Sequence, residues 1–438
     1  MLYLCRFALL TEWNVSQWSA LQPADAFNRH QHLGWKGKLA HISGFASYLS
    51  TQIQEICFDA DLIIVQRNLT HQTVLDAIWY FMAAGKPVII HLDDGYWMLP
   101  RSNPAYQYWN KTPHTDPTGK VYPGGALKMM EEGIRRAHGL TCPNRLLLQD
   151  YSHLTKNLYY LQNYAEPSWW LGLPSSDDIR TGRQWWRETW WREGGEVESR
   201  EWRVESKDNN RSPLHATRST VRGIPTRETL KKERGLEDKV IIGWGGSISH
   251  KDGWHGSGLR EAAERVTKRH PDLIWLICGN DNSIYEHLNV PRRQKIKQPG
   301  VPPALWPRTV SMFDIGVAPL FGIYDQRRSW IKGIEYALGG VPWIGTEGEP
   351  YRDLLGWPVG IQGPEIPDFW EEALEDTLAN LKDRQEQAVS LQGEARLRFL
   401  VDNQLDTFAA VFNQVIQDFE DMTLGLPNVV WLEGKEDG

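Results

Sequence analysis

Short apolar runs alternate with helix-like segments in two separate parts of the chain. In the first part we expect strands at residues 2–9, 61–66, 86–92 and 139–142, and helices at 45–57, 73–84 and 127–137. In the second part we expect strands at 239–242, 273–278, 313–319 and 341–345, and helices at 258–270 and 330–338. Apolar runs of this length are typical of parallel strands buried on both faces, and their alternation with helices indicates βαβ units. The sequence therefore predicts an α/β protein with two Rossmann-like domains.

The length of 438 residues agrees with two domains, because a single core seldom grows so large. We expect the first domain at residues 1–173 and the second at 235–395. Between them lies a segment rich in tryptophan and arginine, residues 174–234, which breaks the alternating pattern and is predicted to be an insertion or elaborated linker. An amphipathic helix at about 396–420 is expected to return to the first domain.

Composition excludes some classes of protein. The net charge of −7 argues against a chain that as a whole binds nucleic acid without specificity. No apolar run approaches the roughly 20 residues of a membrane-spanning helix, and the first residues are typical of a strand rather than a signal peptide. Cys5, Cys57, Cys142 and Cys278 are scattered without the spacing of a zinc site, as expected for buried thiols of a cytoplasmic protein. The 22 tryptophans suit stacking surfaces for sugars or bases as well as cores.

A glycine-rich loop follows the first strand of the second domain. It comprises Gly243, Trp244, Gly245, Gly246 and Ser247, with His250 three residues later. Glycines after a strand allow backbone N–H groups to approach a phosphate closely, although a plain tight turn has the same composition. The fingerprint of a dinucleotide-dependent oxidoreductase fits less well, because its third glycine is missing and the next helix begins late.

A second cluster of functional residue types lies at the helix expected over residues 330–338. Arg328 and Lys332 are four residues apart, so both cations fall on one face near the helix N-terminus, where they suit a diphosphate. Glu335 falls on the same side and can accept hydrogen bonds from ribose hydroxyls. The alternative is a solvated helix face, but the neighbouring residues are apolar.

These segments resemble the donor-binding domain of family-four retaining glycosyltransferases of the GT-B fold. The resemblance is carried by residues 314–320, which include Pro319 and Leu320, by Arg328, Ser329, Lys332 and residues 335–337, by 340–342, and by the loop 243–250. In the first domain, residues 61–67 and 85–94 are similar to the family's segment that ends in paired aspartates. One departure is clear: many relatives have a glutamate eight residues before Glu335, where this chain has Arg327.

The resemblance implies a glycosyltransferase with two lobes facing across a cleft, which moves a sugar from a nucleotide-sugar donor with retention of anomeric configuration. The donor would be bound by Gly245, Gly246, Ser247, His250, Gly279, Asn280, Pro319, Leu320, Arg328, Lys332 and Glu335. Arg328 and Lys332 would stabilise the leaving diphosphate, which helps to take the proton of the acceptor hydroxyl. No other cofactor and no metal are expected.

The paired aspartates Asp93 and Asp94 follow a predicted parallel strand, where open α/β sheets place their ligands. We interpret them as catalytic residues on the acceptor side, next to Arg67 and His91. A metal site and a helix N-cap are the alternatives; the first lacks a third ligand at a suitable spacing.

The inserted segment suggests an acceptor. It interleaves Trp185 and Trp186 with Arg187, and Arg211 and Arg218 follow in a stretch, residues 206–227, whose one acid is Asp208. Cations follow a phosphate backbone, and aromatic faces stack on exposed bases. This pattern predicts DNA with a hydroxymethylated base as acceptor, as in virus-encoded enzymes that glycosylate their own genomes. A carbohydrate acceptor on the same tryptophans, an amphipathic helix packed on the protein, and a noncatalytic binding module remain open.

Overall fold

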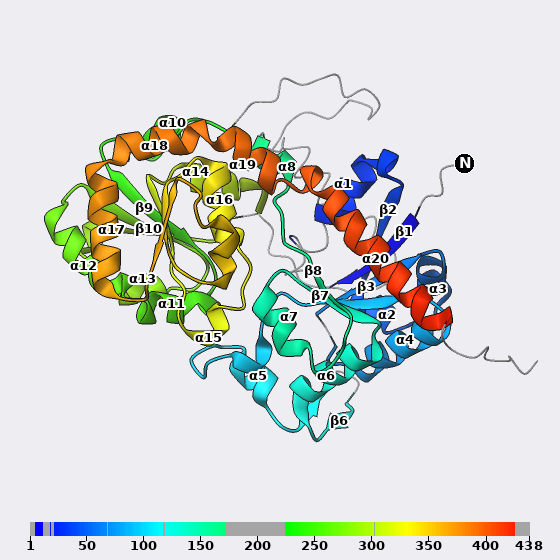
Figure 1. Ribbon diagram of the computed structural model, residues 1–438. Coiled ribbons are helices and arrows are strands. Elements are labelled where there is room, and N and C mark those ends of the chain that lie inside the picture. The colour runs from blue at the N-terminus through cyan, green and yellow to red at the C-terminus, as the bar shows by residue number, and fades with distance from the viewer. Residues whose placement is uncertain are drawn as a thin grey trace, which may run out of the picture.

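The computed structural model describes residues 5–11, 18, 22–67, 69–116, 119–171, 224–301 and 303–424. They form two α/β lobes side by side, each built on a six-stranded parallel sheet (Figure 1). The predicted segment 174–234 lies outside the described residues up to position 223. That part includes Trp185, Trp186, Arg187, Arg211 and Arg218. Its described end contains α10 (Arg227–Lys232).

The sheet of the first lobe has the strand order β2-β1-β3-β4-β7-β8. These strands span Trp35–His41, Cys5–Thr11, Leu62–Gln66, Val88–His91, Gly139–Cys142 and Leu158–Tyr160. Its helices are α1 (Gln22–Arg29), α2 (Ile42–Phe45), α3 (Thr51–Phe58), α4 (Gln72–Ala83), α5 (Tyr106–Asn110), α6 (Gly125–Arg136), α7 (Arg145–Tyr151) and α8 (Pro167–Leu171), with short 3-10 turns η2 (Gln31–Leu33) and η3 (Tyr96–Met98). A small antiparallel pair, β5 (His114–Thr115) and β6 (Val121–Tyr122), lies beside the sheet.

The sheet of the second lobe has the order β11-β10-β9-β12-β13-β14. Its strands span Lys295–Gln298, Leu273–Cys278, Val240–Gly245, Ile315–Ala318, Trp343–Thr346 and Gly360–Gly363. Its helices are α11 (Lys251–Gly256), α12 (Leu259–Arg269), α13 (Ser283–His287), α14 (Trp306–Ser311), α15 (Gly322–Asp325), α16 (Ile331–Gly339), α17 (Pro367–Ala379) and α18 (Leu381–Ser390). The order reverses between β9 and β12, and such a switch point is where doubly wound sheets bind ligands.

All eight predicted strands are present. The strands that were not predicted are the edge strands of the two large sheets and the short pair β5 and β6. Inner strands such as β3 and β10 are buried at every position, so they read as continuous apolar runs. The edge strands β2, β8, β11 and β14 alternate or are partly exposed, and β2 and β11 carry lysines, which is typical of protected sheet edges.

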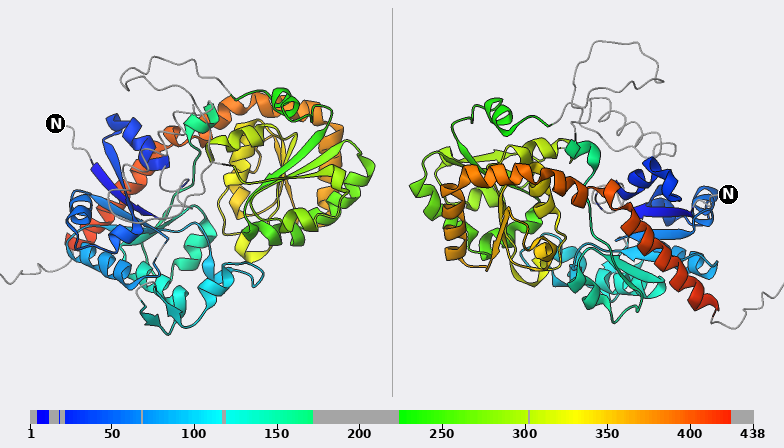
Figure 2. Two further views of the ribbon diagram at one scale, coloured as in Figure 1. Left: turned by 180° about the vertical axis from the view of Figure 1, so that it is seen from behind. Right: turned by 45° about the horizontal axis from the view of Figure 1, so that its top comes forward.

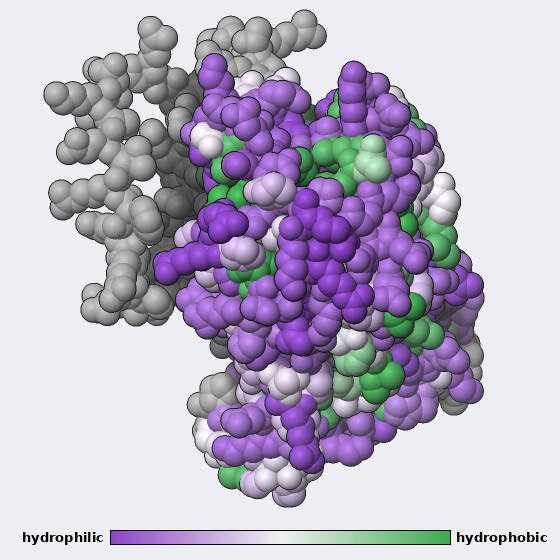
Figure 3. All heavy atoms as spheres, turned by 90° about the vertical axis from the view of Figure 1, so that its left-hand side faces the viewer, coloured by the Kyte–Doolittle hydropathy of each residue, from purple (hydrophilic) through white to green (hydrophobic). Residues whose placement is uncertain are grey.

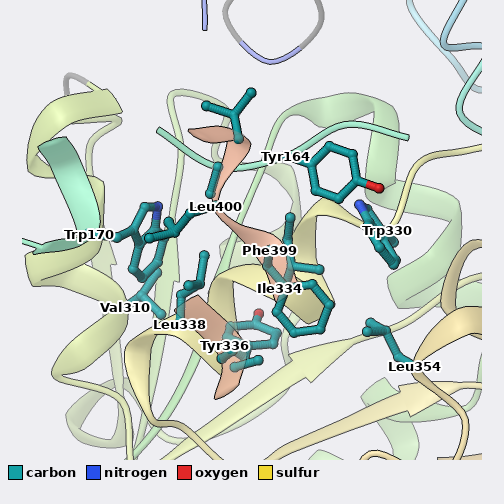
Figure 4. Close-up of a cluster of buried hydrophobic side chains, with 14 of the residues drawn as sticks. Tyr164, Trp170, Val310, Trp330, Ile334, Tyr336, Leu338, Leu354, Phe399 and Leu400 are labelled. Carbon is teal, nitrogen blue, oxygen red and sulfur yellow. The ribbon is translucent and has the colours of Figure 1, made fainter. Parts of the chain in front are cut away.

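A shared apolar core joins the two lobes where the chain crosses between them (Figure 4). Trp330 and Ile334 of the second lobe pack with Tyr164 of the first and Phe399 of the returning chain. The ring centroids of Trp330 and Phe399 are 5.5 Å apart, and those of Tyr164 and Trp330 are 5.7 Å apart. The two crossing segments also bond to each other, because the N–H of Ala165 donates to the carbonyl of Phe399 at 2.8 Å. This core positions the cleft between the lobes.

The C-terminal part of the chain returns to the first lobe, as Figures 1 and 2 show. The single helix expected at about 396–420 is wrong in detail: the chain forms α19 (Gln392–Phe399), a 3-10 turn η8 (Val401–Asn403) and α20 (Leu405–Leu424). The break occurs where Ala165 pairs with Leu400 as an isolated bridge, so backbone bonds to the other crossing segment replace helical ones. Phe412 of α20 then packs on Phe27 and Trp35, with ring centroids 6.0 and 5.4 Å apart.

The outer face of the second lobe is mainly hydrophilic (Figure 3). Across α12 and α17, Arg265 and Arg269 form ion pairs with Asp368, Glu371 and Glu375. None of the helices in the described part of the chain is long and apolar enough to cross a membrane. Cys57, Cys142 and Cys278 are free and buried.

Candidate active site

A cavity of about 600 Å³ lies between the lobes, at the carboxyl ends of β9 and β12. The second lobe contributes most of its wall, and the first lobe closes it with Trp18, Asp93, Asp94 and Asn163. We call it the donor cavity, after the ligand that the sequence predicts there. Among the residues predicted to bind the donor, those that line it are Gly245, Gly246, Ser247, His250, Gly279, Asn280, Leu320, Arg328, Lys332 and Glu335. Pro319 is not among the lining residues. Its backbone carbonyl oxygen instead lies against Gly253, where an added Cβ atom would be 2.8 Å away.

Arg328 is held in place from several sides. Its guanidinium forms an ion pair with Asp325 at 2.8 Å, donates to the carbonyl of Ser249 at 2.8 Å and lies 4.7 Å from the ring centre of Tyr324. It also donates to Nε2 of His250 at 2.9 Å. These contacts fix a cation at the cavity wall before any ligand binds.

His250 serves Arg328 as a neutral partner. Burial lowers the pKa of His250 well below its usual value, and the nearby charges of Arg328 and Lys332 lower it further. Because Nε2 accepts from Arg328, the ring proton is assigned to Nδ1. That atom is buried and has no hydrogen-bond partner among the described residues.

Lys332 and Glu335 lie about one helical turn apart in α16, with Glu335 buried and Lys332 half-buried. Burial lowers the pKa of Lys332 to about 8, against the attraction of Glu335. Burial likewise raises the pKa of Glu335 to about 7, against the attraction of Lys332 and a hydrogen bond from Trp306. The Lys332 ammonium donates to the carbonyl of Gly245 and lies 4.9 Å from the ring centre of Trp244. The start of α16, at Ser329 and Ile331, opens into the same cavity and adds its positive dipole end.

The glycines of the loop after β9 have a packing reason as well. A Cβ atom at Gly245 would lie 2.0 Å from the ring of Trp306, and one at Gly246 would lie 2.8 Å from Trp244 and 3.0 Å from Nζ of Lys332. The absence of side chains therefore makes room for Trp306 and for the cation. This packing by itself requires glycine at both positions.

Asp93 and Asp94 lie at the wall that the first lobe contributes. Burial raises the pKa of both carboxyl groups, and repulsion from Asp93 adds to the rise for Asp94, while Arg67 and Arg328 oppose it. Tyr324 of the second lobe donates to Oδ1 of Asp94 at 3.4 Å. Oδ1 of Asp93 is buried without a hydrogen-bond partner among the described residues. Because these pKa values are raised, the pair keeps a proton to a higher pH than an ordinary carboxyl group does, and both residues line the donor cavity.

A second cavity of about 560 Å³ adjoins the first. Asp94 and Ser247 line both cavities. The second cavity is otherwise lined by Arg67, Thr70, Tyr96, Leu99, Asn103, Ala105, Tyr108, Trp109, Ser249 and Tyr324. Of the residues predicted on the acceptor side, Arg67 and Asp94 line it, Asp93 lines only the donor cavity, and His91 lines neither. His91 is buried, and its Nδ1 lies 3.0 Å from the Thr141 hydroxyl.

Several lining residues were missed by the sequence analysis. Trp306, Asn163 and Tyr351 line the donor cavity, while Tyr96, Tyr108 and Trp109 line the second. The one local signal for them is the tryptophan and tyrosine content of residues 96–109. Their placement depends on how the lobes meet, which no local pattern records.

Comparison with solved structures identifies the fold. Anabaena HepE in complex with UDP and glucose matches with a TM-score of 0.54 and 11% identity over 95% of this chain and 100% of that one. A glycosyltransferase from Rickettsia africae ESF-5 matches with a TM-score of 0.55 and 10% identity over 94% and 99% of the two chains. WaaG, a glycosyltransferase involved in lipopolysaccharide biosynthesis, matches with a TM-score of 0.53 and 12% identity over 93% and 98%.

These likenesses confirm the predicted GT-B fold. No model of a known protein family matches the chain, and no curated protein matches it.

Proposed function

We propose that this protein is a glycosyltransferase that moves a sugar from a nucleoside-diphosphate sugar to a hydroxyl acceptor. One observation carries the proposal: two cations, Arg328 and Lys332, share the wall of an interlobe cavity with Glu335 and face Asp94 of the other lobe. Fixed cations at a helix N-terminus stabilise the charge that develops on a leaving diphosphate. The structure of HepE with UDP and glucose, which has the same fold, supports a uridine nucleotide as the donor.

The reaction that we infer proceeds with retention, as the family resemblance implies. The bond between the anomeric carbon and the diphosphate oxygen breaks, and the acceptor oxygen bonds to that carbon on the same face. The leaving diphosphate, neutralised by Arg328 and Lys332, takes the proton of the acceptor hydroxyl. Glu335 is proposed to accept hydrogen bonds from the ribose, and Asp94 to orient the acceptor.

The hydroxymethylated DNA base remains a second candidate for the acceptor. It depends on the interleaved residues Trp185, Trp186 and Arg187 and on the cations Arg211 and Arg218, all outside the described residues. The sequence pattern alone favours it.

A panel of UDP- and GDP-linked sugars tests the proposal. Released nucleoside diphosphate would be measured with and without hydroxyl acceptors, and the anomeric configuration of the product would be read by NMR. We expect release that depends on the acceptor and a product of retained configuration. A protein that binds these donors and releases no diphosphate with any acceptor is a binding module, and that result would reject the proposal.

A further inference from the structure

The proposed function requires an acceptor with a hydroxyl group, but it names neither the cavity that binds this acceptor nor its chemical class. We propose that the second cavity binds the acceptor, and that the acceptor is a neutral sugar unit rather than a phosphate-bearing molecule. The inference rests on the proposed function, because it assumes a donor in the adjoining cavity.

The position of the second cavity suits an acceptor. It meets the donor cavity at Asp94 and Ser247, one residue from each lobe. A hydroxyl group that reaches this junction lies beside the half-buried Asp94 carboxyl group and the Ser247 hydroxyl. Any acceptor must bring one hydroxyl to the donor carbon, and the two described cavities share this junction.

Aromatic rings line part of the cavity. Tyr96 and Trp109 stack with ring centroids 4.2 Å apart, and Tyr108 meets Trp109 edge to face at 5.3 Å. Tyr108 is 47% exposed, yet its hydroxyl lies 2.7 Å from that of buried Thr70. An exposed ring anchored in this way is a preorganised platform, and the apolar face of a sugar ring packs on such a platform at little entropic cost.

The charges around the cavity argue against a phosphate. Among the residues that line this cavity, Arg67 is the one basic side chain and Asp94 the one acidic side chain, so the described wall carries no cluster of cations. Arg67 is committed to its own neighbours, because it donates to the Tyr96 hydroxyl at 3.5 Å and lies within the field of Asp93 and Asp94. Nucleic acids are bound by side chains that neutralise several phosphates in a row. Within the described wall no such row is present.

The polar groups that remain suit hydroxyl groups. Ser247 and Ser249 lie side by side with their hydroxyl oxygens 2.6 Å apart, and both reach the cavity. Together with the Asp94 carboxyl group they offer hydrogen-bond donors and acceptors to a ligand in this cavity. A sugar ring, which has an apolar face and hydroxyl groups at its edge, can use both the aromatic and the polar lining groups. A volume of this size lies within the roughly 300–1,000 Å³ of typical small-ligand sites.

The test compares acceptors at a saturating concentration of a donor whose binding is first measured by calorimetry. Neutral methyl glycosides, the same sugars carrying a 6-phosphate, and DNA with hydroxymethylated bases would be compared by kcat/KM. We expect the neutral glycosides to be preferred, with a KM that changes little between roughly 50 and 200 mM salt, whereas DNA binding would weaken steeply. Tyr108→Ala should raise the acceptor KM about tenfold and leave the donor Kd unchanged.

Two variants act as controls. Tyr108→Phe keeps the ring, so its acceptor KM should stay within about threefold of the wild type. Gln107→Ala changes an exposed neighbour in α5 that does not line the cavity, and it should behave as the wild type.

Three results would overturn the inference and leave the donor site intact. They are a preference for DNA or for the phosphorylated sugars, failure of every neutral glycoside despite donor binding, and an unchanged acceptor KM in Tyr108→Ala. Absence of donor binding would instead reject the proposed function, and the inference with it.

Discussion

Arg327 of the second lobe forms a two-bonded ion pair with Asp150 of α7 in the first lobe. Nε donates to Oδ2 at 2.6 Å and Nη2 donates to Oδ1 at 3.2 Å. Both side chains are largely buried, with 14% and 19% exposed. Next to the pair, the Asn144 side-chain amide donates to the carbonyls of Gln326 and Arg328, at 2.9 Å each. Arg327 therefore ties the two lobes together next to Arg328, which lines the donor cavity.

This pair predicts a coupling between lobe closure and turnover. Arg327→Ala should lower kcat/KM about tenfold or more, since hydrogen bonds between charged groups contribute about 1.5–3 kcal/mol. Asp150→Asn should have a similar effect, and the double variant should be little worse than either single one, because the two act as a unit. Steady-state kinetics of all three variants measures this.

Arg145 provides the matched control. It also bridges the lobes, to Asp353 at 3.1 Å, but its side chain is 43% exposed. Exposed pairs typically contribute about 0–1 kcal/mol, so Arg145→Ala should change kcat/KM by less than about fivefold. Additive effects of Arg327→Ala and Asp150→Asn would show that the pair is not a functional unit.

The shifted pKa values of Lys332 and Glu335 predict a bell-shaped pH dependence of donor affinity. The diphosphate requires a protonated Lys332, whose pKa is lowered to about 8, so affinity should fall as pH rises above that value. The ribose requires an ionised Glu335, whose pKa is raised to about 7, so affinity should fall as pH decreases below it. Each limb should approach about tenfold per pH unit.

Calorimetric titration with UDP between pH 5.5 and about 9.5 would record both limbs. Lys332→Arg should remove the alkaline limb, because arginine stays charged over this range. Glu335→Gln should remove the acid limb. An alkaline limb that persists in Lys332→Arg would assign it to another group.

Activity is expected to be independent of divalent metal. The carboxylates Asp93 and Asp94 are already faced by Arg67 and Arg328, and the described residues include no group of three or more His, Cys, Asp or Glu side chains arranged for a metal ion. After treatment with a chelator, diphosphate release should continue at close to its initial rate. Loss of activity that manganese or magnesium restores would assign the aspartates to a metal site.

Substitution by alanine should destabilise the protein at Gly243 and stabilise it at Gly393. A Cβ at buried Gly243 would lie 2.1 Å from the Phe313 ring, so Gly243→Ala should lower the free energy of unfolding by about 1–3 kcal/mol. Gly393, exposed in α19, has no atom within 4 Å of the same position, so Gly393→Ala should stabilise by about 0.5–1 kcal/mol. Thermal unfolding of both variants decides this, and equal effects would contradict the packing described around Gly243.

The sequence predicts the parts of the fold that depend on local patterns. Strands such as β3 and β10 are apolar at every position, and α16 ends as predicted because Gly340 adopts a left-handed conformation with φ 63°. Edge strands such as β2 escape prediction because their partly exposed positions contain lysines. Their pairing is set by the neighbouring strand rather than by their own composition.

The residues of the candidate site also fall into two groups, those placed by local sequence spacing and those placed by tertiary packing. Arg328, Lys332 and Glu335 lie within one helical stretch, so their spacing places them together before the fold is known. Trp306 comes from a different helix, and Asp150 from a different lobe. Contacts between distant segments depend on lobe packing, which periodicity cannot report.

Binding of UDP to the wild type and to Lys332→Ala, measured by calorimetry at pH 7.5, tests the central claim most directly. Loss of a charged contact to phosphate should raise Kd by about 10- to 150-fold. Lys382→Ala, which removes a lysine whose side chain is 87% exposed on α18, should leave Kd unchanged. We expect one UDP bound per wild-type chain and the large loss of affinity in Lys332→Ala alone. Equal affinity of all three proteins, or no binding of UDP to the wild type, would contradict the central claim.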